Sequence, residues 1–367
     1  MSIVRSSGRL PRVVANSSGA CPDPLLGVAA YDREALAAWL ANRGEPGFRT
    51  GQLVRWLYQR GAASYEEMTD LPAALRAALA EQLVLARPRL EVTEVSKLDD
   101  TRRYLWRLAD GATVESVGLP ADDRLTVCFS AQAGCAMGCS FCATAAGGLA
   151  RNLGPGEMAD QVRLVGEDFA ARVTNAVAMG QGEPFANYDA TLGGLRLMND
   201  ADGLGIGARH LTVSTCGIIS GIERFSREPE QFTLAVSLHS AVQATRDSLM
   251  PGVRTQRLPE LREALERYTR RTGRRVSLEY ALAEGINDSE AEIGALIRFC
   301  AGLLCHVNLI PVNPVADRTH LRPSAERLSL SLAALESAGV QATVRTERGA
   351  DIEAACGQLT QRHADAK

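Results

Sequence analysis

Three closely spaced cysteines give the clearest chemical signal of the sequence. They lie in the segment Cys135-Ala-Met-Gly-Cys139-Ser-Phe-Cys142, which follows a predicted strand. On one tight loop, three thiolates can each bind a different iron of a cubane cluster, and Gly134 and Gly138 let the backbone pass close to inorganic sulfide. The fourth iron then lacks a protein ligand and can chelate a substrate. A three-cysteine zinc site is the alternative, but no fourth ligand stands beside the motif.

Phe141 stands directly before the third cysteine and can shield a cluster from water. This aromatic residue and the C-x3-C-x2-C spacing resemble the radical SAM superfamily, whose members bind S-adenosylmethionine (SAM) at the cluster. The resemblance implies that Cys135, Cys139 and Cys142 hold a [4Fe–4S] cluster. It also implies reductive cleavage of SAM to a 5′-deoxyadenosyl radical.

A glycine-rich segment, Met179-Gly-Gln-Gly182-Glu183-Pro184, follows the next predicted strand. Superfamily members carry a Gly-Glu-Pro segment here, which meets the amino end of SAM, so Glu183 would supply the carboxylate for that ammonium group. Polar residues also end later strands, and barrel enzymes place their sites at such carboxyl ends. Each is typical of a turn cap by itself, but together they predict a polar site: Ser214-Thr215, Ser237-Leu-His239 and Asn313.

Two further cysteines indicate which family within the superfamily the sequence resembles. Cys128 lies on the strand just before the cluster loop, and Cys356 lies in Gly349-Ala-Asp-Ile-Glu-Ala-Ala-Cys356. Alone, both are typical of buried core thiols. With other segments in the same order, they resemble the RlmN family of dual-specificity methyltransferases, which act on carbon 2 of adenine in ribosomal and transfer RNA. The segments are Phe48-Arg-Thr-Gly-Gln52, Glu67-Met-Thr-Asp-Leu71, Arg151-Asn-Leu153, Gly182-Glu-Pro184, Ser237-Leu-His239 and Asn308-Leu-Ile-Pro311.

The resemblance assigns roles to individual residues. Cys356 matches the methyl carrier, Cys128 its resolving partner and Glu115 the base that removes the ring proton, although Glu115 alone is typical of a solvated strand residue. The cluster ligands are the three loop cysteines already named. The residues that match the SAM contacts are Gly182, Glu183, Ser214, Ser237, Leu238, His239 and Asn313.

The implied reaction uses two SAM molecules per turnover. Carbon 2 is flanked by ring nitrogens and electron-poor, so a radical can add where an ordinary methyl transfer fails. In the family, one SAM methylates the thiolate that matches Cys356, and the second supplies the radical that activates the methyl group. The thiol that matches Cys128 then releases the product and leaves a disulfide. The implied partners are 23S rRNA, tRNA, an electron donor such as flavodoxin, and a thiol reductant for the Cys128–Cys356 disulfide.

Some positions depart from the family pattern, and two other functions stay open. Gln181 stands where relatives commonly have Met, and Cys216 where Ser is frequent; Cys216, Cys300 and Cys305 are interpreted as core thiols. One alternative is a Cfr-type enzyme, which methylates carbon 8 and shares the cluster and both reactive cysteines. The other is an inactive iron–sulfur protein that binds RNA.

The elements that must position these residues change character along the chain. Residues 1–28 are expected to form a flexible tail, 29–85 a helical accessory domain and 86–120 a small β extension with a hairpin at Asp110-Gly111. From 121 to 360, strands alternate with helices, which predicts an α/β fold with a parallel sheet, open or rolled into a barrel. The resemblance implies a partial (β/α) TIM-type barrel, followed by a short tail, 361–367.

Composition limits the class of protein. The chain has 367 residues, 46% of them hydrophobic, and a net charge of −3, which excludes a strongly basic protein but not a local basic surface for RNA. No apolar run is long enough for a spanning helix or a secretory signal, so we expect a cytoplasmic protein without a membrane partner. Nine cysteines in such a protein indicate metal or catalytic thiols before structural disulfides.

Overall fold

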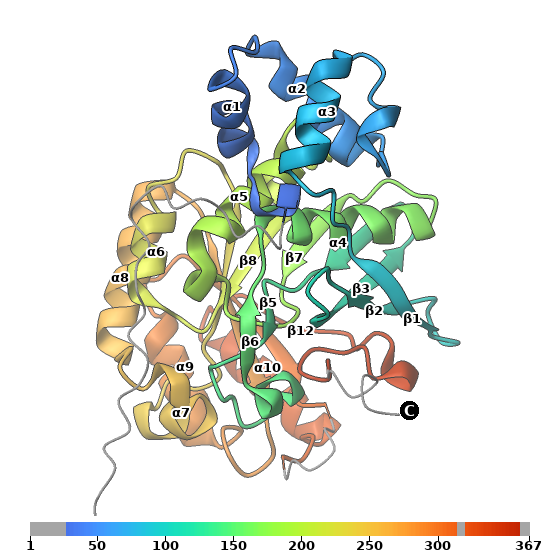
Figure 1. The fold of residues 1–367 in the computed structure, drawn as a ribbon. Helices are drawn as coiled ribbons and strands as arrows, with labels where there is room; N and C mark the ends of the chain where they lie inside the picture. Colours follow the sequence, from blue (N-terminus) through green and yellow to red (C-terminus); the bar gives the residue numbers. More distant parts are fainter. Residues whose placement is uncertain (1–26, 314–319, 360–367) are drawn as a thin grey trace, which may run out of the picture.

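The computed structural model of the chain describes residues 27–313 and 320–359. The predicted tails lie outside these ranges, except that residues 27 and 28 belong to a short 3-10 helix, Gly27–Ala30. Figure 1 shows a group of N-terminal helices above a central sheet whose outer face is covered by further helices. Among the helices of the described ranges, none has both the length and the apolar character that crossing a bilayer requires.

A ten-stranded sheet forms the centre of the described molecule, and its strands follow one another in chain order. From β4 onward all neighbours are parallel, and β4 and β12 lie far apart in the order, so the sheet is an open, partial barrel. This confirms the predicted α/β fold. The parallel strands are β4 (Arg124–Cys128), β7 (Asn175–Ala178), β8 (Leu211–Thr215), β9 (Thr233–Ser237), β10 (Val276–Leu282), β11 (Cys305–Pro311) and β12 (Ala342–Val344).

Helices follow most of the parallel strands and cover the sheet. Strands such as β9 are apolar in consecutive positions because a covered parallel sheet buries both faces, and Leu234, Ala235 and Val236 are fully buried. Ser289 and Ser324 cap α9 and α10 through their hydroxyl oxygens. The helices are α4 (Pro155–Asp168), α5 (Tyr188–Asn199), α6 (Ile219–Phe225), α7 (Gln243–Leu249), α8 (Leu258–Thr272), α9 (Glu290–Cys300) and α10 (Ala325–Ser337).

The β extension continues the barrel sheet. Strands β1 (Arg89–Val95), β2 (Arg102–Arg107) and β3 (Thr113–Ala121) form an antiparallel meander, and β3 pairs with β4 so that Val117 lies opposite Cys128. The predicted hairpin between β2 and β3 is present. This pairing fixes the extension beside the strand that leads into the cysteine loop.

The N-terminal helices are α1 (Arg33–Ala41), α2 (Phe48–Val54), which runs into a π-helical turn (Arg55–Gln59), and α3 (Ala73–Gln82). Asp32 caps α1, since its Oδ1 accepts from the Ala35 N–H at 2.8 Å. Helix α2 begins at Phe48, and the Thr50 N–H already donates to the Gly47 carbonyl. Ion pairs such as Arg33–Asp200 join these helices to the loop after α5.

Candidate active site

A cavity of about 430 Å³ opens at the carboxyl ends of the parallel strands. Every one of these strands contributes a lining residue at or near its end. The cavity also collects most residues singled out in the sequence: Cys128, Cys135, Cys139, Cys142, Gly182, Glu183, Ser214, Ser237, His239, Asn313 and Cys356. Side chains from distant segments therefore meet in one space of a size typical for ligands.

A small two-stranded sheet holds the cysteine loop. Its strands, β5 (Gln132–Gly134) and β6 (Leu149–Asn152), enclose the loop, and the Cys135 N–H donates to the Gly148 carbonyl at 2.8 Å. Gly134 has a φ of 77°, and a Cβ there would lie 2.1 Å from the Gly148 oxygen. Only glycine fits this turn, so the backbone is shaped to bring the three thiols to the cavity wall.

These residues fit an iron–sulfur cubane better than a single metal ion. The loop offers three thiol donors to one cavity. Within the described residues, no three His, Cys, Asp or Glu side chains converge on a point that could hold one ion. A zinc site needs such convergence, whereas a cubane presents its irons at separate corners. Phe141 packs edge-on against His239, with ring centroids 4.7 Å apart, and helps to enclose this end of the cavity.

Glu183 is a buried carboxylate at the end of the glycine-rich segment. Its two oxygens accept from the N–H groups of Phe185 at 2.9 Å and Cys216 at 2.6 Å. Burial raises the pKa of Glu183, and a cation bound nearby would favour its charged form. Gly182, with a φ of 100°, lets the chain pass so close to Gln132 that a Cβ would lie 2.5 Å from that side chain.

His239 is held neutral and in one orientation. Burial lowers its pKa to about 3, with a further contribution from Arg246. The Ala281 N–H donates to His239 Nδ1 at 2.9 Å, so Nε2 carries the proton as a donor. Its backbone adopts a φ of 56°, which is uncommon outside glycine, and the Asn287 amide donates to its carbonyl at 2.6 Å. Ser214 and Ser237 lie next to one another, with 3.5 Å between their hydroxyl oxygens.

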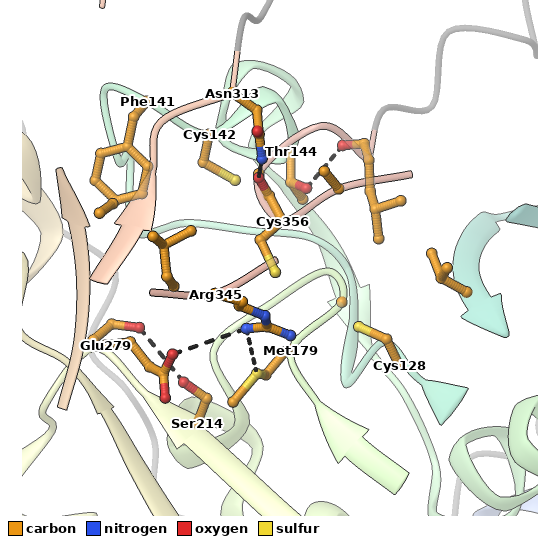
Figure 2. Close-up of a pocket in the computed structure, with 18 of the residues that line it drawn as sticks. Cys128, Phe141, Cys142, Thr144, Met179, Ser214, Glu279, Asn313, Arg345 and Cys356 are labelled. Atoms are coloured by element: carbon orange, nitrogen blue, oxygen red, sulfur yellow. Dashed lines mark hydrogen bonds and ion pairs between the residues drawn. The ribbon is translucent and has the colours of Figure 1, made fainter. Parts of the chain in front are cut away.

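Cys128 and Cys356 face the same cavity (Figure 2). Cys128 ends β4 and is buried, which raises its pKa to about 12; the Cys356 thiol raises it further and Arg345 lowers it. Cys356 is half-buried and, like Cys128, a free thiol. The two thiols are therefore close enough to influence one another.

The segment around Cys356 is bonded directly to the cysteine loop. The Ala143 N–H donates to the Gly357 carbonyl at 2.7 Å, and the Thr144 hydroxyl donates to the Leu359 carbonyl at 2.9 Å. The Asn313 amide donates to the Cys356 carbonyl at 3.2 Å. These bonds fix the C-terminal segment against the residues that follow Cys142.

Comparisons with known proteins agree with this arrangement. Residues 26–85 match the ribosomal RNA large subunit methyltransferase N-terminal domain, and residues 129–297 match the radical SAM superfamily. A probable dual-specificity RNA methyltransferase RlmN from Pelotomaculum thermopropionicum is 47% identical over 88% of this chain and 88% of its own length. The chain belongs to the RlmN family. An RlmN from Symbiobacterium thermophilum, also named as probable, is 45% identical over 90% of both chains.

A solved structure supports the fold of this RlmN-family chain. The crystal structure of a radical SAM methyltransferase from Sphaerobacter thermophilus is 44% identical and superposes with a TM-score of 0.85, covering 91% of this chain and 98% of the other. The predicted family and the predicted class of enzyme, a radical SAM RNA methyltransferase, are confirmed. Membership implies SAM and a [4Fe–4S] cluster as cofactors.

Two residues that match family site positions do not line the cavity. The Leu238 side chain is fully buried in the main core, because alternation along the strand end points Ser237 and His239 to one face and Leu238 to the other. Glu115 is 1% exposed on β3. Its carboxylate accepts from the Gln181 amide at 3.4 Å and lies 3.9 Å from Arg103.

Cys216 is not the core thiol that the sequence suggested. It lines the cavity, and its thiol is hydrogen-bonded to that of Cys139. Cys216 lies two residues after Ser214, so the strand alternation that faces Ser214 to the cavity does the same for Cys216. Cys300 and Cys305 are buried as expected and contact each other.

Two charged residues of the site were not predicted from the sequence. Arg345 directly follows β12, and Glu279 lies on β10; both line the cavity and form an ion pair, with 3.8 Å between Arg345 Nη1 and Glu279 Oε2. Arg345 stands at the carboxyl end of β12, in the region where strands and helices were predicted to alternate. The rule that drew attention to Ser214 and Ser237 could have found it.

Proposed function

We propose that this chain methylates carbon 2 of adenosine in 23S rRNA, at the peptidyl-transferase centre, and in tRNA, beside the anticodon. Cys356 would carry the methyl group and Cys128 would release the product. The observation that supports this most is the meeting of these two thiols with Cys135, Cys139 and Cys142 in one cavity. A protein that used the cluster only as a scaffold would have no need of two further thiols at that place.

The residues divide the proposed chemistry between them. Bound at the three loop cysteines, the cluster with SAM supplies a radical able to take hydrogen from a methyl group. Glu183, Ser214, Ser237, His239 and Asn313 hold the SAM, as do Gly182 and the backbone of Leu238. Cys356 attacks the methyl carbon of a first SAM, so its sulfur gains a thioether bond and the sulfonium departs as a neutral thioether. Two SAM molecules are consumed in each turnover.

After hydrogen loss, the methylene carbon on Cys356 adds to the adenine ring. Glu115 takes the ring proton, which requires its carboxylate to approach the cavity from its present place beside Gln181. Cys128 then attacks the Cys356 sulfur. A disulfide bond would form as the sulfur–carbon bond breaks and the carbon is protonated to a methyl group. A cluster held by Cys135, Cys139 and Cys142 would supply the acceptor for the one surplus electron.

The proposed partners follow from this sequence of events. A thiol reductant must reopen the Cys128–Cys356 disulfide, and an electron donor such as flavodoxin must first reduce the cluster. The target adenine must leave its stack to reach the thiols that line the cavity. The proposed RNA substrates and the reducing conditions that free thiols need both occur in the cytoplasm. The proposed reaction therefore takes place there.

Mass mapping of the RNA product tests the proposal. The purified protein with its cluster is incubated with SAM, a reductant and either 23S rRNA or tRNA, and methylated adenosine is located within the nucleotide. A methyl group at carbon 2 is expected. A methyl group at carbon 8 would establish the Cfr-type alternative, and RNA that binds but is never methylated would establish the inactive one.

A further inference from the structure

Arg345 occupies a central place in the cavity. Its N–H donates to the Leu309 carbonyl at 2.8 Å, which fixes the residue beside the end of β11. Its Nη1 lies 3.7 Å from the Met179 sulfur and 3.8 Å from Glu279 Oε2. Figure 2 shows the Cys356 sulfur above the guanidinium and pointing toward it, with Cys128 to the right and Glu279 to the left.

Three groups that can carry negative charge surround this guanidinium: Cys356, Glu279 and Cys128. Cys356 contributes most to a raised pKa of Arg345, and Glu279 and Cys128 add to it. Burial raises the pKa of Glu279, and its other oxygen is held by the Asn308 amide at 2.8 Å. The cation is thus shared between a fixed carboxylate and two thiols.

Both thiols must act as anions in the proposed reaction, because the thiolate and not the thiol is the nucleophile. In the first step the Cys356 thiol loses its proton to solvent, and its sulfur then bonds to the methyl carbon while the old carbon–sulfonium bond breaks toward the departing thioether. In the last step the Cys128 sulfur forms the disulfide. The thiolate of Cys128 is the harder of the two to form, because burial disfavours its negative charge.

We infer that Arg345 is a positioning residue that stabilises the anionic sulfur of Cys356 for methyl transfer and then that of Cys128 for product release. The inference rests on the proposed function, in which these sulfurs are the nucleophiles. A purely structural Arg345 would pair with Glu279 and leave the thiols unaffected. The two roles therefore predict different reactivities of the Cys356 thiol when Arg345 is replaced.

Alkylation of the full-length protein measures that reactivity without RNA or methyl transfer. Parent, Arg345→Gln and Arg345→Lys proteins are treated with iodoacetamide across a range of pH, and the rate at unmethylated Cys356 is followed by peptide mass spectrometry. Arg348→Gln is the matched control, because Arg348 lines the same cavity but donates to the Pro120 carbonyl. The buried Cys300 peptide reports any general opening of the fold.

At neutral pH, Arg345→Gln is expected to slow alkylation of Cys356 about tenfold, because the anionic sulfur loses the cation beside it. Arg345→Lys should keep most of the rate, since it keeps the charge, and Arg348→Gln should match the parent. Equal Cys356 rates in the parent and Arg345→Gln would overturn the inference. So would a slow Arg345→Lys protein with an intact fold, since shape and not charge would then matter.

Methyl transfer to RNA, measured on the same proteins and on Cys356→Ala, separates this inference from the proposed function. If Cys356→Ala still methylates RNA, the carrier role fails whatever the alkylation rates. If Cys356→Ala is inactive but Arg345→Gln alkylates like the parent, only the role of Arg345 fails.

Discussion

The cysteine loop and the pair formed by Cys128 and Cys356 contribute sulfur to one cavity by opposite routes. The loop places three thiols within a single short segment, and two strands and a glycine turn shape it locally. The pair joins the end of β4 to a segment close to the C-terminus, and only the complete barrel brings them together. A motif of the first kind is visible in the sequence itself, whereas the second is a product of the fold.

The strongest way to test this comparison is to remove one thiol from each region. Cys139→Ala should lose the cluster and, with it, all SAM cleavage and methylation. Cys356→Ala should keep iron content and SAM binding but lose methyl transfer entirely, because the carrier alone is missing. Iron analysis, visible absorption and a methylation assay measure these outcomes. Methylation by Cys356→Ala would show that the Cys128–Cys356 pair has no role separate from that of the cysteine loop.

The Cys128→Ala variant distinguishes the role of Cys128 from that of Cys356. Without a thiol to attack the Cys356 sulfur, the bond between Cys356 and the adenine cannot be broken, so the reaction should stop at a covalent protein–RNA adduct. Denaturing electrophoresis with labelled RNA detects such an adduct. Free methylated RNA formed at the parent rate would contradict the resolving role of Cys128.

The Gln181→Met variant tests the proposed role of Glu115 as the base that takes the ring proton. The Gln181 amide donates to the Glu115 carboxylate, and a hydrogen bond to a charged group favours that form. Its loss should therefore lower the rate of methylation severalfold, with little change in cluster content. An unchanged rate, together with full activity of Glu115→Gln, would remove Glu115 from the mechanism.

The smallest effect is expected where the two regions touch. Thr144→Val removes the hydrogen bond to the Leu359 carbonyl, which is worth ~1 kcal/mol, and should loosen residues 354–359 without changing the cluster. Hydrogen exchange of that segment should increase, and methyl transfer should fall a few-fold. Thr174→Val, which removes a comparable hydroxyl bond to the Leu125 carbonyl that residues 354–359 do not share, serves as a matched control.

Sequence patterns predicted the strands, most helices and the cysteine loop because these depend on neighbours along the chain. They paired Cys128 with Cys356 only through resemblance to a family, since no local rule joins residues so far apart. Strand alternation, had it been applied after Ser214 and after Ser237, would have placed Cys216 in the cavity and Leu238 in the core. The contact of Glu115 with Gln181 depends on the sheet register between β3 and β4 and could not be derived from one sequence.

The bonds from Ala143 and Thr144 to the C-terminal segment also bear on how the enzyme fails under oxidative stress. If loss of the proposed cluster changed the shape of the loop, these bonds would carry the change to the segment of Cys356. Under the proposed function, damage to the metal centre would then also displace the methyl carrier, and the enzyme would stop before methylated carriers accumulated that no radical could use.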